Sequence, residues 1–116
     1  MAYLVELTLR AERDLDDLYQ RISADDSAAA ARWFNGLEKA IYTLERMPRR
    51  CPIAHESKKA KRRLRHLLYG AKRDVYRVIF EINESHKAVR VLTIRHAAMD
   101  QFSAARSRRA MDHSTN

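Results

Sequence analysis

The sequence predicts a single α+β domain in which a small antiparallel β-sheet carries a packed helix hairpin. Residues 3–9 and 76–82 alternate apolar and polar side chains, whereas residues 11–47 repeat apolar side chains at helical spacing. Only two glycines and two prolines occur in 116 residues, of which 46% are hydrophobic. The predicted order is strand, two helices, three strands and a short C-terminal helix, β-α-α-β-β-β-α. We assign residues 1–110 to one domain and expect residues 111–116 to form a disordered tail.

The N-terminal strand leads directly into the predicted helix hairpin. Apolar residues recur every three or four positions from Ala11 to Ile22, and Thr8 or a neighbour is placed to cap this helix. Asp25 or Asp26 is the expected N-cap of a second helix that ends before Pro48. The apolar stripe of the second helix, which core packing explains, consists of Trp33, Leu37, Ala40, Ile41, Leu44 and Met47.

Residues 48–61 hold both prolines and show no periodicity, which predicts a loop crossing from the helices to the sheet. The single cysteine, Cys51, excludes an intrachain disulfide and suits a reducing cytoplasm, and we expect it to be buried. No secretory signal or apolar run of bilayer length is evident. We therefore expect a cytoplasmic protein without a membrane partner.

Residues 76–82 and 88–94 are separated by a short polar break and are expected to form an antiparallel hairpin. If Ile82 pairs with Val89, then Phe80 meets Val91 and Val78 meets Thr93. That register places His96 on the face of Arg77.

The alternation of apolar and polar residues, continued toward the N-terminus across a turn at residues 70–74, predicts a third strand. It places Leu64 and Leu68 on the core side and Arg63 and Arg65 on the face of Arg77. A cationic sheet face with one histidine is the result, although a slip of one residue would invert each assignment.

The net charge of +8 is concentrated in one third of the chain. Residues 49–77 contain eleven Lys/Arg and two Asp/Glu, whereas residues 1–48 carry a net charge of −3. Such an excess points either to a polyanionic partner, which would be a phosphate backbone or an acidic protein segment, or to a solvated basic surface. The five histidines show no zinc spacing, and we expect neither a metal nor a cofactor.

The order of these elements, with VYRVIFEI followed by VRVLTIRHAAMD, resembles the RelE/ParE superfamily of toxins from bacterial type II toxin–antitoxin systems. The resemblance covers nearly the whole chain. Its pieces are Ala11-x-x-Asp14-Leu15, Met47-Pro48 with Cys51-Pro52 beyond, Tyr76-Arg77-Val78, and Ile94-Arg95-His96 with Asp100 after it. It implies a small basic toxin held in a hetero-oligomer by a cognate antitoxin, whose acidic and partly disordered segment covers the basic face.

Two biochemistries diverge within the superfamily, and both arrest growth. RelE-like members cleave mRNA in the ribosomal A site without a metal, whereas ParE-like members poison DNA gyrase. For the RelE-like reading the resemblance implies that Arg77 stabilises the phosphorane, that Arg63 and Arg65 form the basic pair, and that His96 serves as acid or base. The RNA contacts would come from Lys61, Arg62, Arg73, Arg95 and Phe102.

Three features depart from the RelE-like pattern. Phe102 lacks the hydroxyl of the usual tyrosine, and arginines replace the lysines that would supply the base. The long second helix and the Arg95-His96-x-x-x-Asp100 spacing look more like the ParE-like branch. We favour ribosome-dependent mRNA cleavage from the sequence, with a ParE-like gyrase poison as the alternative and an inactive homologue or RNA-binding domain as a second alternative.

Each candidate also has a purely structural interpretation. Arg77 would pair with Glu81 or with an acid from a helix, and His96 would be a hydrogen-bonded histidine at a strand end. The run of cations from Lys58 to Arg65 would be a solvated edge strand that its charges keep from aggregating.

Overall fold

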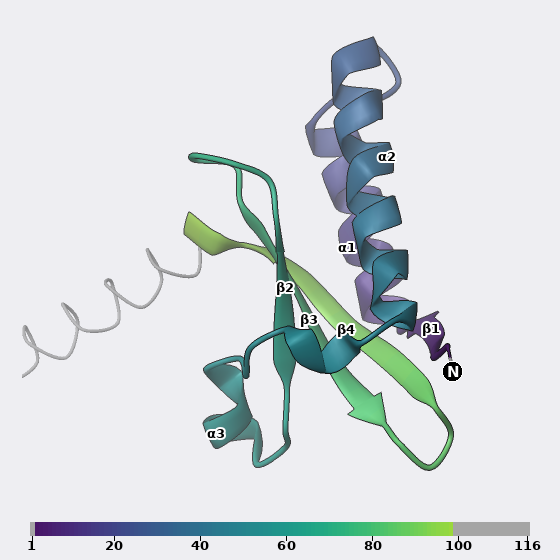
Figure 1. Cartoon of the computed structure of the whole chain (residues 1–116). Coiled ribbons are helices and arrows are strands. Elements are labelled where there is room, and N and C mark those ends of the chain that lie inside the picture. Colours follow the sequence, from purple (N-terminus) through teal and green to yellow (C-terminus); the bar gives the residue numbers. More distant parts are fainter. Residues whose placement is uncertain (1, 99–116) are drawn as a thin grey trace, which may run out of the picture.

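A computed structural model describes residues 2–98 as a four-stranded sheet with helices on both sides (Figure 1). The strand order is β1-β4-β3-β2, with β1 parallel to β4 and the other pairs antiparallel. The predicted α+β class is confirmed, and the N-terminal strand makes the sheet mixed. The elements are β1 Leu4–Leu7, α1 Leu9–Arg21, α2 Ala28–Tyr42, α3 Glu56–Ala60, β2 Arg65–Tyr69, β3 Tyr76–Asn83 and β4 Ala88–His96, with 3₁₀ turns at Thr43–Glu45 and Pro48–Arg50.

The predicted C-terminal helix over residues 97–110 and the predicted tail fall, from residue 99 onward, outside the described residues. Within residues 2–98, no helix is both long and apolar enough to cross a bilayer.

The two helices of the hairpin begin at side-chain caps. The Thr8 hydroxyl accepts a hydrogen bond from the Ala11 N–H at 3.2 Å, which confirms the first cap. The second prediction is wrong, because Ser27 caps α2 by accepting from the Ala30 N–H at 3.2 Å. Asp25 instead lies in the turn between the helices, where it accepts a hydrogen bond from the Tyr19 hydroxyl at 2.6 Å.

The apolar stripe of α2 runs through Phe34, Leu37 and Ile41, all buried. Trp33 is only partly buried beside this line, so the predicted stripe is displaced by one residue at its start. Met47, predicted as its last member, is 76% exposed and has a positive φ of 46°. The reason is that α2 ends at Tyr42 and the following 3₁₀ turn changes the helical phase.

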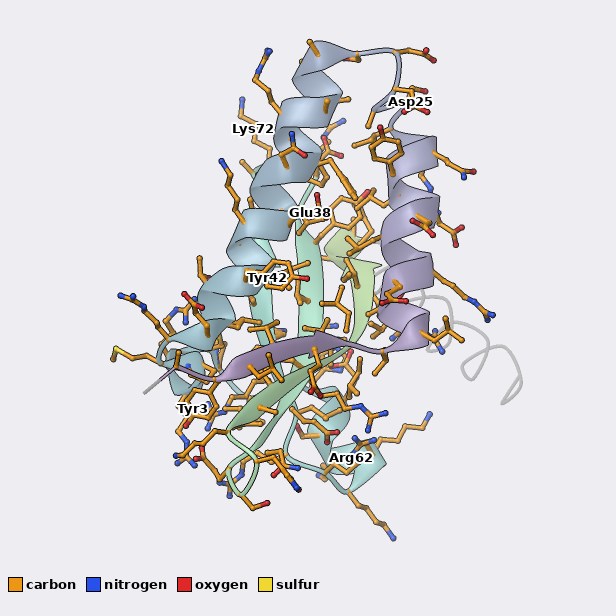
Figure 2. All side chains as sticks on the ribbon, turned by 90° about the vertical axis from the view of Figure 1, so that its right-hand side faces the viewer. Tyr3, Asp25, Glu38, Tyr42, Arg62 and Lys72 are labelled. Carbon is orange, nitrogen blue, oxygen red and sulfur yellow. The ribbon has the colours of Figure 1, made fainter. Side chains whose placement is uncertain are left out.

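The main core lies between the helix hairpin and one face of the sheet, which we call the helix face. Figure 2, viewed from that side, shows α1 and α2 standing in front of the strands. Large side chains from β3 and β4 meet the α2 stripe there and lose all contact with water. The fully buried members of this core include Phe80, Val78, Val89, Val91, Leu37, Ile41 and Leu44.

The opposite face of the sheet, which we call the outer face, is covered by α3 and by the residues Ala54 and Leu64 that flank it. The prediction of a loop over residues 48–61 is therefore wrong in part, since this segment contains a 3₁₀ turn and α3. The helix α3 lies across the sheet from α1 and α2 (Figure 1). Ala54, Leu64 and Ile79 form a small apolar cluster beneath it, with Leu92 packed alongside. Cys51 is buried in the main core as predicted.

A β-bulge at Leu92 changes the predicted hairpin register. Ile82 pairs with Val89 and Phe80 with Val91, as predicted, but Ile79 then pairs with Thr93, so Leu92 has no partner. Every pair beyond the bulge is shifted by one residue. Arg77 consequently pairs with Arg95, and His96 lies on the helix face beside Tyr76 rather than with Arg77.

The bulge lies where β1 ends and α1 takes over as the neighbour of β4. The Thr8 hydroxyl donates to the Leu92 carbonyl at 3.0 Å, and the Asp14 carboxylate accepts from the Ile94 N–H at 3.0 Å. These side chains satisfy backbone groups that a longer β1 would otherwise bind.

The register of β2 is also one residue away from the prediction. Arg65 pairs with Phe80 and Leu68 with Arg77, so Arg65 lies on the helix face and Leu68 on the outer face. The turn between β2 and β3 sets this register through two left-handed residues, Gly70 at φ 109° and Lys72 at φ 57°. The prediction that Arg65 and Arg77 share one face is wrong.

Candidate functional site

Arg77 is the centre of a charged cluster between α3 and the outer face of the sheet. Its two terminal nitrogens donate to the two carboxylate oxygens of Glu56, each at 2.7 Å, and its Nε donates to Nδ1 of His66 at 3.0 Å. The Arg77 side chain is 6% exposed and the Glu56 side chain 21%. The structural interpretation of Arg77, a pairing with a helix acid, therefore describes its surroundings, and the acid is Glu56 of α3.

The side chains of Arg95 and His55 also lie near the same carboxylate. Arg95 Nη1 lies 3.9 Å and His55 Nε2 lies 3.4 Å from Glu56 Oε2. The hydrogen bonds from Arg77 lower the pKa of Glu56 to about 2, against the opposing effect of burial. We call Glu56, His66, Arg77 and Arg95 the outer-face cluster.

His66 is held neutral within this cluster. Its Nδ1 accepts from the Arg77 Nε, so the ring proton belongs on Nε2. Burial, followed by the charge of Arg77, lowers the pKa of His66. The guanidinium fork of Arg77 is thus occupied by a carboxylate and a neutral imidazole, and a phosphate would have to displace Glu56 to reach it.

His96 lies on the helix face, in a cavity of about 250 Å³ between α1 and β4. Its ring stands edge-on to Tyr76 with centroids 4.8 Å apart, and its Nε2 is 3.8 Å from a carboxylate oxygen of Asp74. Asp14 and Arg21 of α1 line the same cavity. The sheet therefore separates His96 from Arg77.

Arg63 and Arg65 lie in a second cavity, of about 310 Å³, that Arg49 completes. Arg65 is fixed by hydrogen bonds from its Nη1 to the carbonyls of Cys51, at 2.6 Å, and Arg49, at 3.2 Å. We call Arg49, Arg63 and Arg65 the arginine pocket. Its wall also includes Ile82 and Glu84.

Glu84 ties the arginine pocket to the N-terminus and to the β3–β4 turn. Its carboxylate accepts from Arg49 Nη2 at 2.7 Å, from the Tyr3 hydroxyl at 2.9 Å and from Lys87 Nζ at 3.1 Å. These hydrogen bonds, led by that of Arg49, lower the pKa of Glu84 to about 2.

The predicted RNA contacts are dispersed over the molecule. Lys61 is exposed at the C-terminal end of α3, with a φ of 54°, and Arg62 bonds Glu81 through Nε at 3.1 Å. Arg73 is exposed in the turn between β2 and β3. Phe102 lies outside the described residues.

The sequence patterns did not indicate which residues pair with the candidate site residues. Glu56 lies 21 positions before Arg77, and its only signal is that it is an isolated acid in a strongly basic stretch. Arg49 and Glu84 are 35 positions apart, and Asp14 and Ile94 are 80 apart, so no local pattern announces either contact.

Comparison with known proteins agrees with this architecture. Residues 5–101 match the family described as the ParE toxin of type II toxin–antitoxin systems, parDE. Among solved structures, the RelBE2 toxin–antitoxin complex of Mycobacterium tuberculosis contains a chain that is 26% identical and superposes with a TM-score of 0.52, over 84% of this chain and 94% of that one. No curated protein matches the sequence. This chain belongs to the ParE toxin family of type II toxin–antitoxin systems.

Proposed function

We propose that this toxin arrests growth as a ParE-like, non-catalytic poison of DNA gyrase, and that a cognate antitoxin with an acidic segment holds it inactive. The observation that carries the choice is the separation of the side chains that RNA cleavage would need. Arg77 lies on the outer face in a bidentate pair with Glu56, whereas Arg65 and His96 lie on the helix face.

Metal-free RNA cleavage requires a base, a cation and an acid around one phosphate. In this structure these groups do not converge on one position, because the strands of the sheet lie between Arg77 and the side chains of Arg65 and His96. The most suitable cation, Arg77, is already neutralised by a carboxylate whose pKa is about 2, so the pair stays ionised at neutral pH. A role in binding a protein target needs no such convergence.

Two further observations support the proposal. The family that matches is the ParE branch, to which the superfamily resemblance assigns gyrase. The similar structure from M. tuberculosis is that of a toxin–antitoxin complex, which favours a hetero-oligomer with an antitoxin here as well.

Expression of the chain without its antitoxin tests the proposal. We expect covalent gyrase–DNA complexes to accumulate and a DNA-damage reporter to respond, with cellular mRNA left intact. Purified gyrase should show increased DNA cleavage when the purified chain is added. Co-expression of the antitoxin encoded beside the toxin is the control and should abolish both signals. Growth arrest with codon-edge mRNA cuts and no gyrase complexes would contradict the proposal, and absence of any arrest would favour an inactive homologue.

Ribosome-dependent mRNA cleavage is the second candidate, and the arginine pocket is the observation that favours it. Three guanidinium groups around one cavity fit a phosphodiester. Catalysis by Arg77 and His96 with Arg63 and Arg65 would also require the Glu56 pair to open on the ribosome. Under this candidate Arg77→Ala and Arg63→Ala should abolish mRNA cuts, and since Arg63 is exposed, its variant should keep the melting temperature of the wild type.

A further inference from the structure

Four unpaired cations gather where α3 meets β2. Lys58, Lys59, Lys61 and Arg63 are all exposed, and none of them forms an ion pair with any residue in the part of the chain that the structure describes. They fall within the six positions 58–63, so one short segment carries all four charges. We call these four residues the cationic tip. Figure 2 shows the neighbouring Arg62 at one end of the molecule, with Asp25 of the helix hairpin at the other.

The acids nearest to the cationic tip in sequence and in the sheet are already engaged. Glu56, on the first turn of α3, is bound by Arg77. Glu81 of β3 is bound by Arg62, with Arg90 at 3.9 Å. Asp74, the other acid of residues 49–77, lies near His96 beyond the far end of β2. The positive field of the cationic tip is therefore not cancelled locally.

The chemistry of the cationic tip fits a phosphate backbone read without sequence. Three of its four residues are lysines, which act as mobile point charges rather than as bidentate readers of bases. No Phe, Tyr or Trp occurs from residue 43 to residue 68, so the segment has no large aromatic platform on which unpaired bases could stack. Both features favour a duplex over a single strand.

We propose that the cationic tip is a binding surface for the backbone of duplex DNA. The helix α3, which carries Lys58 and Lys59, lies on the side of the sheet away from the helix hairpin, so DNA bound there would leave α1 and α2 uncovered (Figure 1). The inference does not depend on gyrase being the target, because it concerns contact between this chain and DNA alone.

Fluorescence anisotropy with the purified full chain and a labelled 20-base-pair DNA duplex tests the inference. Three contacts between cations and phosphates should make the affinity of the wild type fall about 40-fold between 50 and 200 mM salt. The triple variant Lys58→Gln, Lys59→Gln, Lys61→Gln should lose that part of the salt dependence, and at 100 mM salt it should bind at least about tenfold more weakly.

The matched control carries the same change of charge on the helix hairpin, Arg10→Gln, Arg13→Gln, Lys39→Gln, at three exposed cations. Its affinity should stay within about twofold of the wild type, and circular dichroism should show both variants folded. Equal weakening of the two variants would reduce the effect to net charge and overturn the inference. The inference would also be overturned if no duplex binding is measurable at 50 mM salt, or if single-stranded RNA binds more tightly than the duplex. A triple variant that binds DNA like the wild type and loses only the binding of its antitoxin would overturn it as well. A gyrase result of either sign leaves this outcome unaffected, since no gyrase is present.

Discussion

The two faces of the sheet are covered by different kinds of structure. On the helix face, two helices capped at Thr8 and Ser27 bury a continuous apolar core around Phe80. On the outer face, a five-residue helix and its flanking loop cover one small apolar cluster, and an ion network completes the interface. Burial holds the first interface together, and charge pairing holds much of the second.

This difference shows why a count of arginines is a poor measure of available charge. Arg77 lies in the face that the sequence marks as cationic, yet its guanidinium joins α3 to the sheet. Arg65 is similarly engaged by two carbonyls. In α3 and the turn that follows it, Lys58, Lys59, Lys61 and Arg63 form no ion pair with a described residue, whereas Arg62 is bound by Glu81, and the sequence does not distinguish between them.

Truncation of one side chain on each face tests this difference most directly. Phe80→Ala should lower the free energy of unfolding by about 4 kcal/mol, because Phe80 is fully buried among side chains from both layers. Ile79→Ala, on the outer face, should cost about 2 kcal/mol, since the small cluster beneath α3 can collapse into the space. Urea denaturation measures both, and an equal loss would show that the outer face is as tightly packed as the core.

The ion network around Glu56 should contribute nearly as much to the free energy of unfolding as a core residue. Glu56→Gln leaves Arg77 buried without its carboxylate and should cost about 3 kcal/mol. The control Glu81→Gln removes an exposed pair with Arg62 and should cost less than about 1 kcal/mol. If the two variants melt at the same temperature, the outer-face cluster does not hold α3 in place.

The Glu56 carboxylate should also make the free energy of unfolding depend on pH in the acid range. Because the pKa of Glu56 is lowered from 4.5 to about 2 on folding, its contribution is complete above pH 4.5 and is lost as the pH falls toward 2. The difference in stability between wild type and Glu56→Gln should therefore shrink below pH 4.5. His66, whose pKa is also lowered, should reduce stability as the pH falls below its ordinary value of 6.5, since the unfolded state then binds the proton more tightly. Urea titrations at several pH values check both slopes, and a difference that is constant from pH 7 to pH 3 would contradict the first.

The two helix caps of the helix face should differ in their contribution to stability. Ser27→Ala should cost about 1 kcal/mol, the usual value of an N-cap. Thr8→Ala should cost about 2 kcal/mol, because it also removes the bond from the Thr8 hydroxyl to Leu92 at the bulge. Equal costs would indicate that the bulge does not depend on Thr8.

The smallest effect is expected at Met47, where the backbone is left-handed. This side chain is 76% exposed, so replacing it loses little burial. Asparagine tolerates φ near 46° better than methionine, and Met47→Asn should raise the free energy of unfolding by about 0.5 kcal/mol. Met47→Leu is the control and should be neutral in thermal melting. A destabilised asparagine variant would show that Met47 makes contacts that its exposure does not suggest.

Much of the secondary structure follows from local pattern. The spacing from Ala11 to Leu18 marks the buried side of α1, and Ile82 opposite Val89 sets the start of the hairpin. Sequence reasoning fails at α3, since five residues with no apolar side chain except Ala60 carry no amphipathic pattern. The candidate site was less predictable than the fold, because every assignment of a side chain to a face required the number of residues in a bulge or turn.

The class of fold, the helix hairpin, the positions of the main strands and the concentration of charge in residues 49–77 could be predicted from the sequence, since each depends on periodicity or composition within a short window. The tertiary structure alone decided which arginines are free. Side chains alternate between faces at every residue of a strand, so the unpaired Leu92 and the turn at Gly70 reassign His96 and Arg65 to the helix face. The bulge is held by Thr8 and Asp14, about 80 positions away, and Arg77 is neutralised by Glu56 at a separation of 21. Contacts of that range leave no mark in a local pattern.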